Sequence, residues 1–190
     1  MNLPNKLTML RIALVPVFVW FASMTSRAIY QWIALAIFVL ASIPDLLDGR
    51  IARSRHLVTD FGKFMDPIAD KLLVMSALVM LVERNYMPGW VCMFMLAGEF
   101  LVSGFRLVAS TKGKVIAAGI WGKLKTVSQM IYIPMALLLI PMKDLSSELE
   151  VNLHDFWHIA TQVIMYISLA LTLWSGFKYI WDNREYLKDM

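Results

Sequence analysis

Two pairs of aspartates lie within 26 residues of a chain that is otherwise apolar enough to lie in a membrane. Asp45 and Asp48 are three residues apart, and Asp66 and Asp70 are four apart. On two helices each pair projects from a single face, and the two faces turned together form one pocket of carboxylates. An unpaired charge in a bilayer costs about 3 kcal/mol or more, and neighbouring carboxylates repel one another. We therefore expect a positive group among them.

Divalent metal ions are the positive group that these ligands favour. Carboxylate oxygen is a hard ligand suited to Mg²⁺, Mn²⁺ or Ca²⁺, and neither pair contains a cysteine or histidine that would favour a softer metal. Two such ions polarise a phosphate group. The alternative is that the aspartates cap or flank helix ends at the water interface, with the nearby glycines as turn residues.

Small residues accompany both pairs of aspartates. Gly49 and Ala52 share a helix with the first pair and leave room beside it. Gly62 lies one turn before Asp66 and leaves room beside the second pair, on the opposite wall of the pocket. A flat or bulky group could enter between these walls. Helix capping alone does not explain two pairs with small neighbours, so we favour a metal site that admits a ligand.

The same residues resemble the signature of the CDP-alcohol phosphotransferases. Every signature residue is present at its spacing: Asp45-x-x-Asp48-Gly49-x-x-Ala52-Arg53, then eight residues, then Gly62-x-x-x-Asp66-x-x-x-Asp70. Three further stretches are similar to phosphatidylglycerophosphate synthases within that family, at residues 2–11, 99–106 and 122–126. The resemblance covers almost the whole chain.

The resemblance implies a transferase that moves a phosphatidyl group from CDP-diacylglycerol to a small alcohol and releases CMP. It implies two divalent ions, Mg²⁺ or Mn²⁺, held by the four aspartates, with Asp70 as the base for the attacking hydroxyl. It also implies a homodimer. The residues expected to bind the CDP-lipid donor are Thr8, Asp48, Gly49, Ala52, Arg53 and Gly62. For Thr8, a role as a cap or interfacial residue stays open.

The acceptor implied by the nearest subfamily is glycerol 3-phosphate, with its phosphate at Arg106, Lys123 and Lys125. Gly98 stands where these synthases usually carry Arg, which removes a cation expected to help hold that phosphate. Serine, inositol phosphate and phosphatidylglycerol therefore stay open as acceptors. Glu99, deep in an apolar run, is either a functional group or the partner of a buried Lys or Arg.

Composition places the chain in a membrane as one domain, residues 1–190. Of its 190 residues 59% are hydrophobic and only 17% are charged, which excludes an ordinary soluble domain. A helix needs about 20 residues to cross the hydrocarbon. Six apolar spans of that order predict an all-α polytopic protein with six transmembrane helices, near residues 7–24, 30–47, 64–84, 88–110, 124–142 and 157–180.

Charge asymmetry predicts the orientation. If the N-terminus is cytoplasmic, 15 of the 18 Lys and Arg residues fall at the inner side, which places both termini and the aspartates in the cytoplasm of a plasma-membrane protein. Membrane lipids are then the expected surroundings, and no nucleic-acid partner is expected. A transporter would also use buried carboxylates, but it usually shows inverted repeats and interrupted spans, which the sequence lacks.

Overall fold

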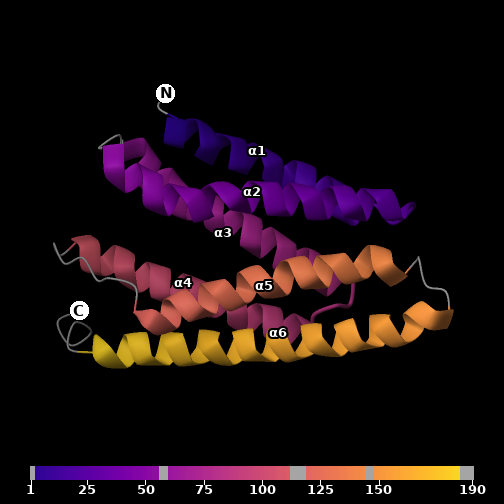
Figure 1. Cartoon of the computed structure of the whole chain (residues 1–190). Coiled ribbons are helices and arrows are strands. Elements are labelled where there is room, and N and C mark those ends of the chain that lie inside the picture. Colours follow the sequence, from indigo (N-terminus) through magenta and orange to yellow (C-terminus); the bar gives the residue numbers. More distant parts are fainter. Residues whose placement is uncertain (1–2, 56–59, 112–118, 144–147, 185–190) are drawn as a thin grey trace. The chain divides into compact units, whose positions relative to one another are not determined.

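The computed structural model contains six helices and, over the residues it describes, no strand (Figure 1). It describes residues 3–55, 60–111, 119–143 and 148–184. For residues 3–7, 44–55, 60–64, 66–67, 70, 107–111, 143 and 148–153 it describes the helical backbone but not the side chains. The helices are α1 (Leu3–Ser23), α2 (Ala28–Arg55), α3 (Asp60–Glu83), α4 (Gly89–Thr111), α5 (Ile120–Lys143) and α6 (Glu148–Asp182).

These helices coincide with the six expected spans, which confirms the prediction of an all-α polytopic membrane protein. Within the described residues, three segments are long and apolar enough to cross a membrane: Gly89–Arg106, Ile120–Met142 and His154–Asp182. Shorter apolar stretches lie in α1 and α2, at Thr8–Ser23 and Ala28–Ile43. The clearest difference is in α2, which continues into the polar signature and ends at Arg55.

The chain divides into two compact units by its internal contacts. Unit 1 comprises Met1–Tyr86 and Ile133–Asp155, and unit 2 comprises Met87–Tyr132 and Phe156–Met190. All four signature aspartates therefore belong to unit 1, and Arg106, Lys123 and Lys125 belong to unit 2. The prediction of a single domain stays a prediction.

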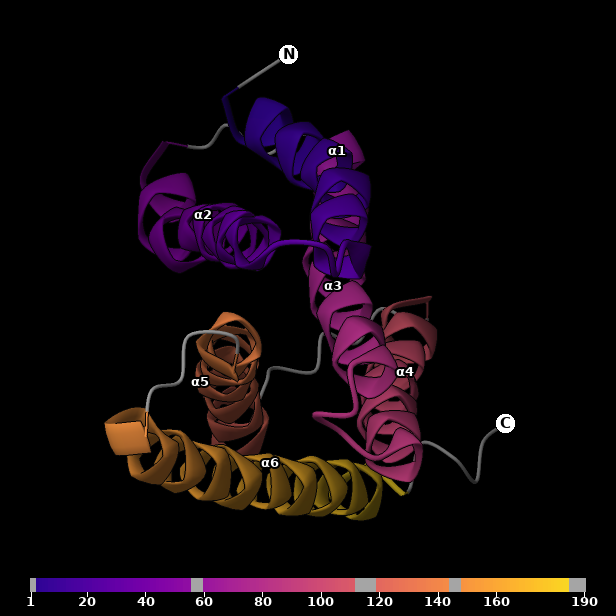
Figure 2. The same ribbon diagram turned by 90° about the vertical axis from the view of Figure 1, so that its right-hand side faces the viewer.

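In unit 1, α1 packs against both α2 and α3 (Figure 2). The buried positions of α1 recur at intervals of three and four residues, which is the spacing of one helix face; they are Thr8, Arg11, Val15, Phe18 and Ala22. Those of α2 follow the same rule and are Gln31, Ala34, Phe38 and Ala41. The rings of Phe18 and Phe38 meet across this interface with centroids 5.9 Å apart. We call the interface that α1 forms with α2 and α3 the unit 1 seam.

The third helix contributes a face of the same kind to unit 1. Ala69, Leu73, Ala77 and Leu81 are buried, whereas Ile68 and Leu72, on the other side of α3, are exposed. Alanine recurs on the buried faces of all three helices, and small side chains allow membrane helices to approach closely. The seam is therefore built from close backbone packing around two phenylalanines.

Side chains and an αL residue terminate the helices of unit 1. Asn85 has φ 62°, and the amides of Asn85 and Tyr86 donate to the carbonyls of Val82 and Leu81. This is the Schellman arrangement, in which Asn is tolerated at the left-handed position. Arg84 donates to the carbonyl of Ala22 near the end of α1, where a cation also favours the helix dipole.

In unit 2, the buried face of α6 is rich in hydroxyl groups, which belong to Thr161, Ser168, Thr172 and Ser175; Met165 lies on the same face. Two of these hydroxyls donate to carbonyls of their own helix, Thr161 to Trp157 at 2.7 Å and Thr172 to Ser168 at 2.8 Å. Opposite them, α4 presents Gly98, where an added Cβ would come within 2.5 Å of the Thr172 methyl carbon. We call this α4–α6 interface the unit 2 seam.

Candidate functional site

The complete signature lies on two helices of unit 1. Asp45, Asp48, Gly49, Ala52 and Arg53 fall within α2, and Gly62, Asp66 and Asp70 fall within α3. Their backbones are helical, and their side chains lie outside the described part of the structure. The predicted roles of these eight residues therefore stay predictions.

Helical spacing connects the signature to the unit 1 seam. Along α2, positions 45, 48 and 52 continue the three-and-four interval of the buried Ala34, Phe38 and Ala41. Along α3, positions 66 and 70 lie in the same helical register as the buried Leu73 and Ala77. By register, these backbone positions therefore continue the line of buried positions along both helices.

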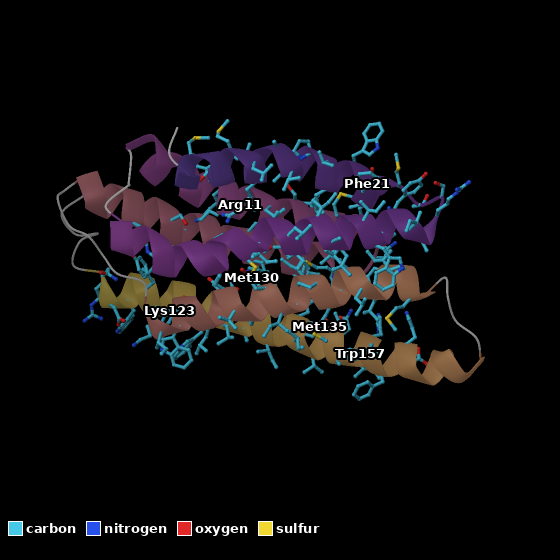
Figure 3. All side chains as sticks on the ribbon, turned by 45° about the horizontal axis from the view of Figure 1, so that its top comes forward. Arg11, Phe21, Lys123, Met130, Met135 and Trp157 are labelled. Carbon is cyan, nitrogen blue, oxygen red and sulfur yellow. The ribbon has the colours of Figure 1, made fainter. Side chains whose placement is uncertain are left out.

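The α1 face of this seam is polar at its N-terminal end. Thr8 and Arg11 are each only 6% exposed, although both are polar. Arg11 Nε donates to the carbonyl oxygen of Ala41 in α2 at 3.0 Å (Figure 3). Ala41 lies one turn before Asp45. The buried Arg11 side chain therefore links α1 to α2 one turn before the first signature aspartate.

Glu99 and Lys125 form an ion pair in unit 2. Glu99 on α4 and Lys125 on α5 approach to 2.7 Å, with side chains 19% and 5% exposed. The sequence left open whether Glu99 is functional or pairs with a buried cation, and the structure gives it Lys125 as a partner. Burying two charges is tolerable only with such close pairing. Lys125 thus already has a carboxylate at its ammonium group.

Arg106 occupies a different setting at the far end of α4. Its guanidinium carbon lies 5.5 Å from the ring centroid of Tyr179 on α6, within the range of a cation–π interaction. Both residues line a cavity of about 240 Å³ whose wall also includes Gly119, Gly122 and Ser175. Of the three cations predicted to bind the acceptor phosphate, Arg106 is the one on this cavity wall.

Lys123, the third predicted acceptor residue, is exposed near the start of α5 (Figure 3). It does not line the cavity that contains Arg106. Its neighbour two positions along, Lys125, turns inward to Glu99. The three cations that the sequence analysis grouped together therefore lie in three different environments.

Gly98 is the position where an arginine was expected from the resemblance. An added Cβ would lie 2.5 Å from the Thr172 Cγ2 atom, closer than real Cβ contacts allow. Thr172 is itself buried and branched at Cβ, so it has few ways to move aside. The space next to Gly98 is therefore filled by α6, and a long side chain at this position would require the helices to move apart.

Comparison with known proteins identifies the chain. A model of the CDP-alcohol phosphatidyltransferase family matches residues 1–174. The chain belongs to this family. It is 35% identical to the CDP-diacylglycerol–glycerol-3-phosphate 3-phosphatidyltransferase of Bacillus subtilis, over 98% of this chain and 97% of that protein. It is 36% identical to the enzyme of the same name from Rickettsia bellii (97% of each chain) and 33% identical to that of Haemophilus influenzae (99% and 96%).

CDP-alcohol phosphatidyltransferases generally depend on divalent metal ions, and the donor set on α2 and α3 fits such an ion. Four carboxylates supply hard oxygen ligands, and the two helices that carry them share one compact unit. Among the described side chains no group of three His, Cys, Asp or Glu is arranged to hold a metal. The four signature aspartates therefore stay the predicted metal ligands.

Sequence reasoning did not single out Tyr179. A signal for Tyr179 was present, because it follows Ser168, Thr172 and Ser175 at the spacing of one helix face. A run of hydroxyl residues at that spacing in the last span of a phosphatidyltransferase predicts a polar interface inside the protein. It does not reveal that the interface ends against Arg106.

Proposed function

We propose that this protein transfers the phosphatidyl group of CDP-diacylglycerol to glycerol 3-phosphate, giving phosphatidylglycerophosphate and CMP. The observation that carries the proposal is the complete aspartate signature, which continues by helical register the buried faces of α2 and α3. Relatives that match nearly the whole chain carry the name of this reaction. The first line of support concerns the reacting groups, and the second concerns the reaction that the relatives are named for.

The reaction needs one proton acceptor and one stabilised leaving group. The hydroxyl oxygen of the acceptor attacks the phosphorus that carries diacylglycerol, and the bond from this phosphorus to the CMP oxygen breaks, with the electron pair leaving on CMP. We assign Asp70 as the group that takes the hydroxyl proton, since an ionised carboxylate within reach can act as a general base. Two bound Mg²⁺ or Mn²⁺ ions would supply charge stabilisation for the diphosphate.

The donor and the ions are assigned to unit 1. Asp45, Asp48, Asp66 and Asp70 would hold the two ions through their carboxylate oxygens. The CDP-lipid would lie against the small residues of the signature and the polar end of α1; the residues proposed are Thr8, Asp48, Gly49, Ala52, Arg53 and Gly62. The burial of Thr8 on the unit 1 seam supports its inclusion.

Acceptor recognition is assigned to the cations of unit 2. Arg106 is the strongest candidate because it lines a cavity, whereas Lys125 is paired with Glu99 and Lys123 is exposed. A guanidinium forms two parallel hydrogen bonds with a phosphate, which a lysine cannot do. We keep Lys123 and Lys125 in the proposed set, with roles secondary to that of Arg106.

We further propose a plasma-membrane location with both termini and the aspartates on the cytoplasmic side. The excess of Lys and Arg in the segments assigned to that side supports this orientation. It also puts the site where nucleotides are found. A homodimer is proposed from the family resemblance alone.

The decisive experiment measures CMP release by the purified protein in detergent. The protein is supplied with CDP-diacylglycerol, Mg²⁺ or Mn²⁺, and in turn glycerol 3-phosphate, serine, inositol phosphate and phosphatidylglycerol. We expect CMP release with glycerol 3-phosphate and little with the others. Release with only another alcohol would keep the reaction class and change the acceptor, whereas no release with any alcohol would contradict the proposal.

A further inference from the structure

One turn of α2, directly before the signature, lacks part of the normal helical hydrogen bonding. Pro44 lies inside this helix and has no backbone N–H. In an α-helix each carbonyl accepts from the amide four residues later, so the Leu40 carbonyl receives no hydrogen bond from position 44. The Ser42 hydroxyl donates to the Phe38 carbonyl at 2.7 Å, a contact that tends to bend helices. The direction of α2 beyond this turn is therefore less firmly set by the helix itself.

Arg11 holds the same turn from the neighbouring helix α1. Its Nε donates to the Ala41 carbonyl oxygen at 3.0 Å. A carbonyl oxygen has two lone pairs, and in the helix the Ala41 oxygen is also the acceptor for the amide of Asp45. The guanidinium and the backbone of the first signature aspartate therefore share one acceptor atom.

Arg11 is unusual among the residues of the unit 1 seam. It is 6% exposed and is the one buried charged residue among the side chains that the structure describes in unit 1. Two turns along the same face of α1, Phe18 packs against Phe38 and holds the two helices together without any charge. Apolar packing would serve equally well at position 11 if only adhesion were needed. The placement of an arginine at the turn that Pro44 loosens therefore indicates a local role.

We propose that Arg11 is a positioning residue for the metal site. By fixing the Ala41 carbonyl, it sets the direction of the α2 segment that carries Asp45 and Asp48, and with it the distance of these positions from the aspartates of α3. Arg11 acts through the backbone of α2 and is assigned no contact with an ion or a substrate. The role deepens the proposed function and rests on it for the metal ions.

The test is the Kd of Mn²⁺ for the full chain in non-ionic detergent without substrates, read from the electron paramagnetic resonance signal of free Mn²⁺. Arg11→Met keeps most of the side-chain volume and removes the hydrogen bond. It should raise Kd about tenfold, the lower end of what the loss of an outer partner costs in metal sites. Arg11→Lys keeps the buried charge but not the fixed geometry of the guanidinium, so its Kd should lie between those of wild type and Arg11→Met.

Gln31→Met is the matched control at the opposite end of the same seam. Gln31 is 5% exposed, and its Nε2 donates to the carbonyls of Ala22 and Met24. Like Arg11, it is a buried side chain that bonds to the backbone of another segment of unit 1. It lies roughly 20 Å along α2 from Asp45. Gln31→Met should therefore lower the thermal stability and leave the Mn²⁺ Kd unchanged.

A wild-type Mn²⁺ Kd in folded Arg11→Met would overturn the proposal. An equal rise of Kd in Gln31→Met would also overturn it, because general loosening of the seam would then explain the effect. A wild-type Kd in Arg11→Lys would do the same, since a buried charge alone would then suffice. If Arg11→Met fails to fold, Arg11→Lys decides: a raised Kd, with Gln31→Met unchanged, supports the positioning role.

Release of CMP separates this role from the proposed function. Arg11→Met should raise the Mn²⁺ concentration for half-maximal release about tenfold and leave the KM for glycerol 3-phosphate near wild type. Mn²⁺ binding that depends on Arg11, without CMP release from any alcohol, would contradict the proposed function and keep the positioning role. Wild-type CMP release with an unchanged Mn²⁺ Kd in the Arg11 variants would keep the function and overturn the role. Absence of Mn²⁺ binding by the wild type would overturn the role together with the metal site.

Discussion

Each compact unit has a buried seam, and the two seams lead toward different charged groups and differ in packing. The unit 1 seam is built from alanines and phenylalanines and leads by register into aspartates. The unit 2 seam is built from glycine and hydroxyl residues, with Arg106 on α4 and Tyr179 on α6 at its end. Carboxylates suit ions and proton transfer, whereas cations suit phosphate recognition. The comparison predicts that variants of the unit 1 aspartates change turnover and that unit 2 variants change acceptor binding or stability.

The largest effect is expected for Asp66→Asn in unit 1. The change keeps the size of the side chain but removes a hard anionic ligand, so CMP release should fall below detection at any metal concentration. Loss of a mere outer-shell partner already costs about 10–100-fold in metalloenzymes, and loss of a ligand should cost more. The measurement is kcat for CMP release across a Mg²⁺ and Mn²⁺ series.

Asp60→Asn is the matched control for Asp66→Asn. Asp60 is the first residue of α3 and lies outside the register shared by positions 66, 70, 73 and 77. We expect it to retain most of the wild-type kcat. Equal loss at both positions would mean that the aspartates of α3 serve folding and not a metal site.

The second largest effect is expected for Lys125→Ala in unit 2. Removing one partner of a buried ion pair leaves Glu99 uncompensated, which costs about 3–5 kcal/mol of stability. Thermal unfolding in detergent should show the loss, and Lys123→Ala, two positions away and exposed, should show little change. A Lys125→Ala protein as stable as wild type would contradict a structural role for the pair.

The double variant Glu99→Gln with Lys125→Met sharpens this prediction. Removing both charges should restore most of the stability, since neutral replacements for a buried pair are often tolerated. If the restored protein has a wild-type KM for glycerol 3-phosphate, Lys125 is structural. A raised KM would indicate that Lys125 also binds the acceptor, as we propose for Arg106.

Sequence alone predicted the six spans because they depend on local periodicity, whereas the pocket formed by the two aspartate pairs stays a prediction. It placed the end of the second span at residue 47, whereas α2 continues to Arg55, because hydropathy falls at the signature while the helical backbone does not end there. It could not choose a partner for Glu99 or connect Arg106 with Tyr179. These contacts join residues on different helices, and the spacing within one helix carries no information about them.

A smaller effect is expected for Arg11→Met on the unit 1 seam. The change keeps most of the side-chain volume but removes the hydrogen bond from Nε to the Ala41 carbonyl. A hydrogen bond from a charged group is worth about 1.5–3 kcal/mol. The free energy of unfolding should therefore fall by an amount of that order. Arg11→Lys should recover only part of the loss because the ammonium cannot reproduce the fixed fork of the guanidinium. Full recovery would show that charge alone matters at this position.

The smallest effect separates two glycines of α4 that look alike in the sequence. At Gly98 an added Cβ would lie 2.5 Å from Thr172 Cγ2, whereas at Gly104 it would meet nothing within 4 Å. Gly98→Ala should therefore destabilise the protein by about 1–3 kcal/mol through overpacking, while Gly104→Ala should stabilise the helix by up to about 1 kcal/mol. Thermal unfolding of the two single variants gives both values, and Gly98→Ala combined with Thr172→Ser, which removes the clashing methyl, should regain most of the loss. If Gly98→Ala is as stable as Gly104→Ala, the α4–α6 interface is looser than the structure places it, and an arginine at position 98 could then be accommodated next to Thr172.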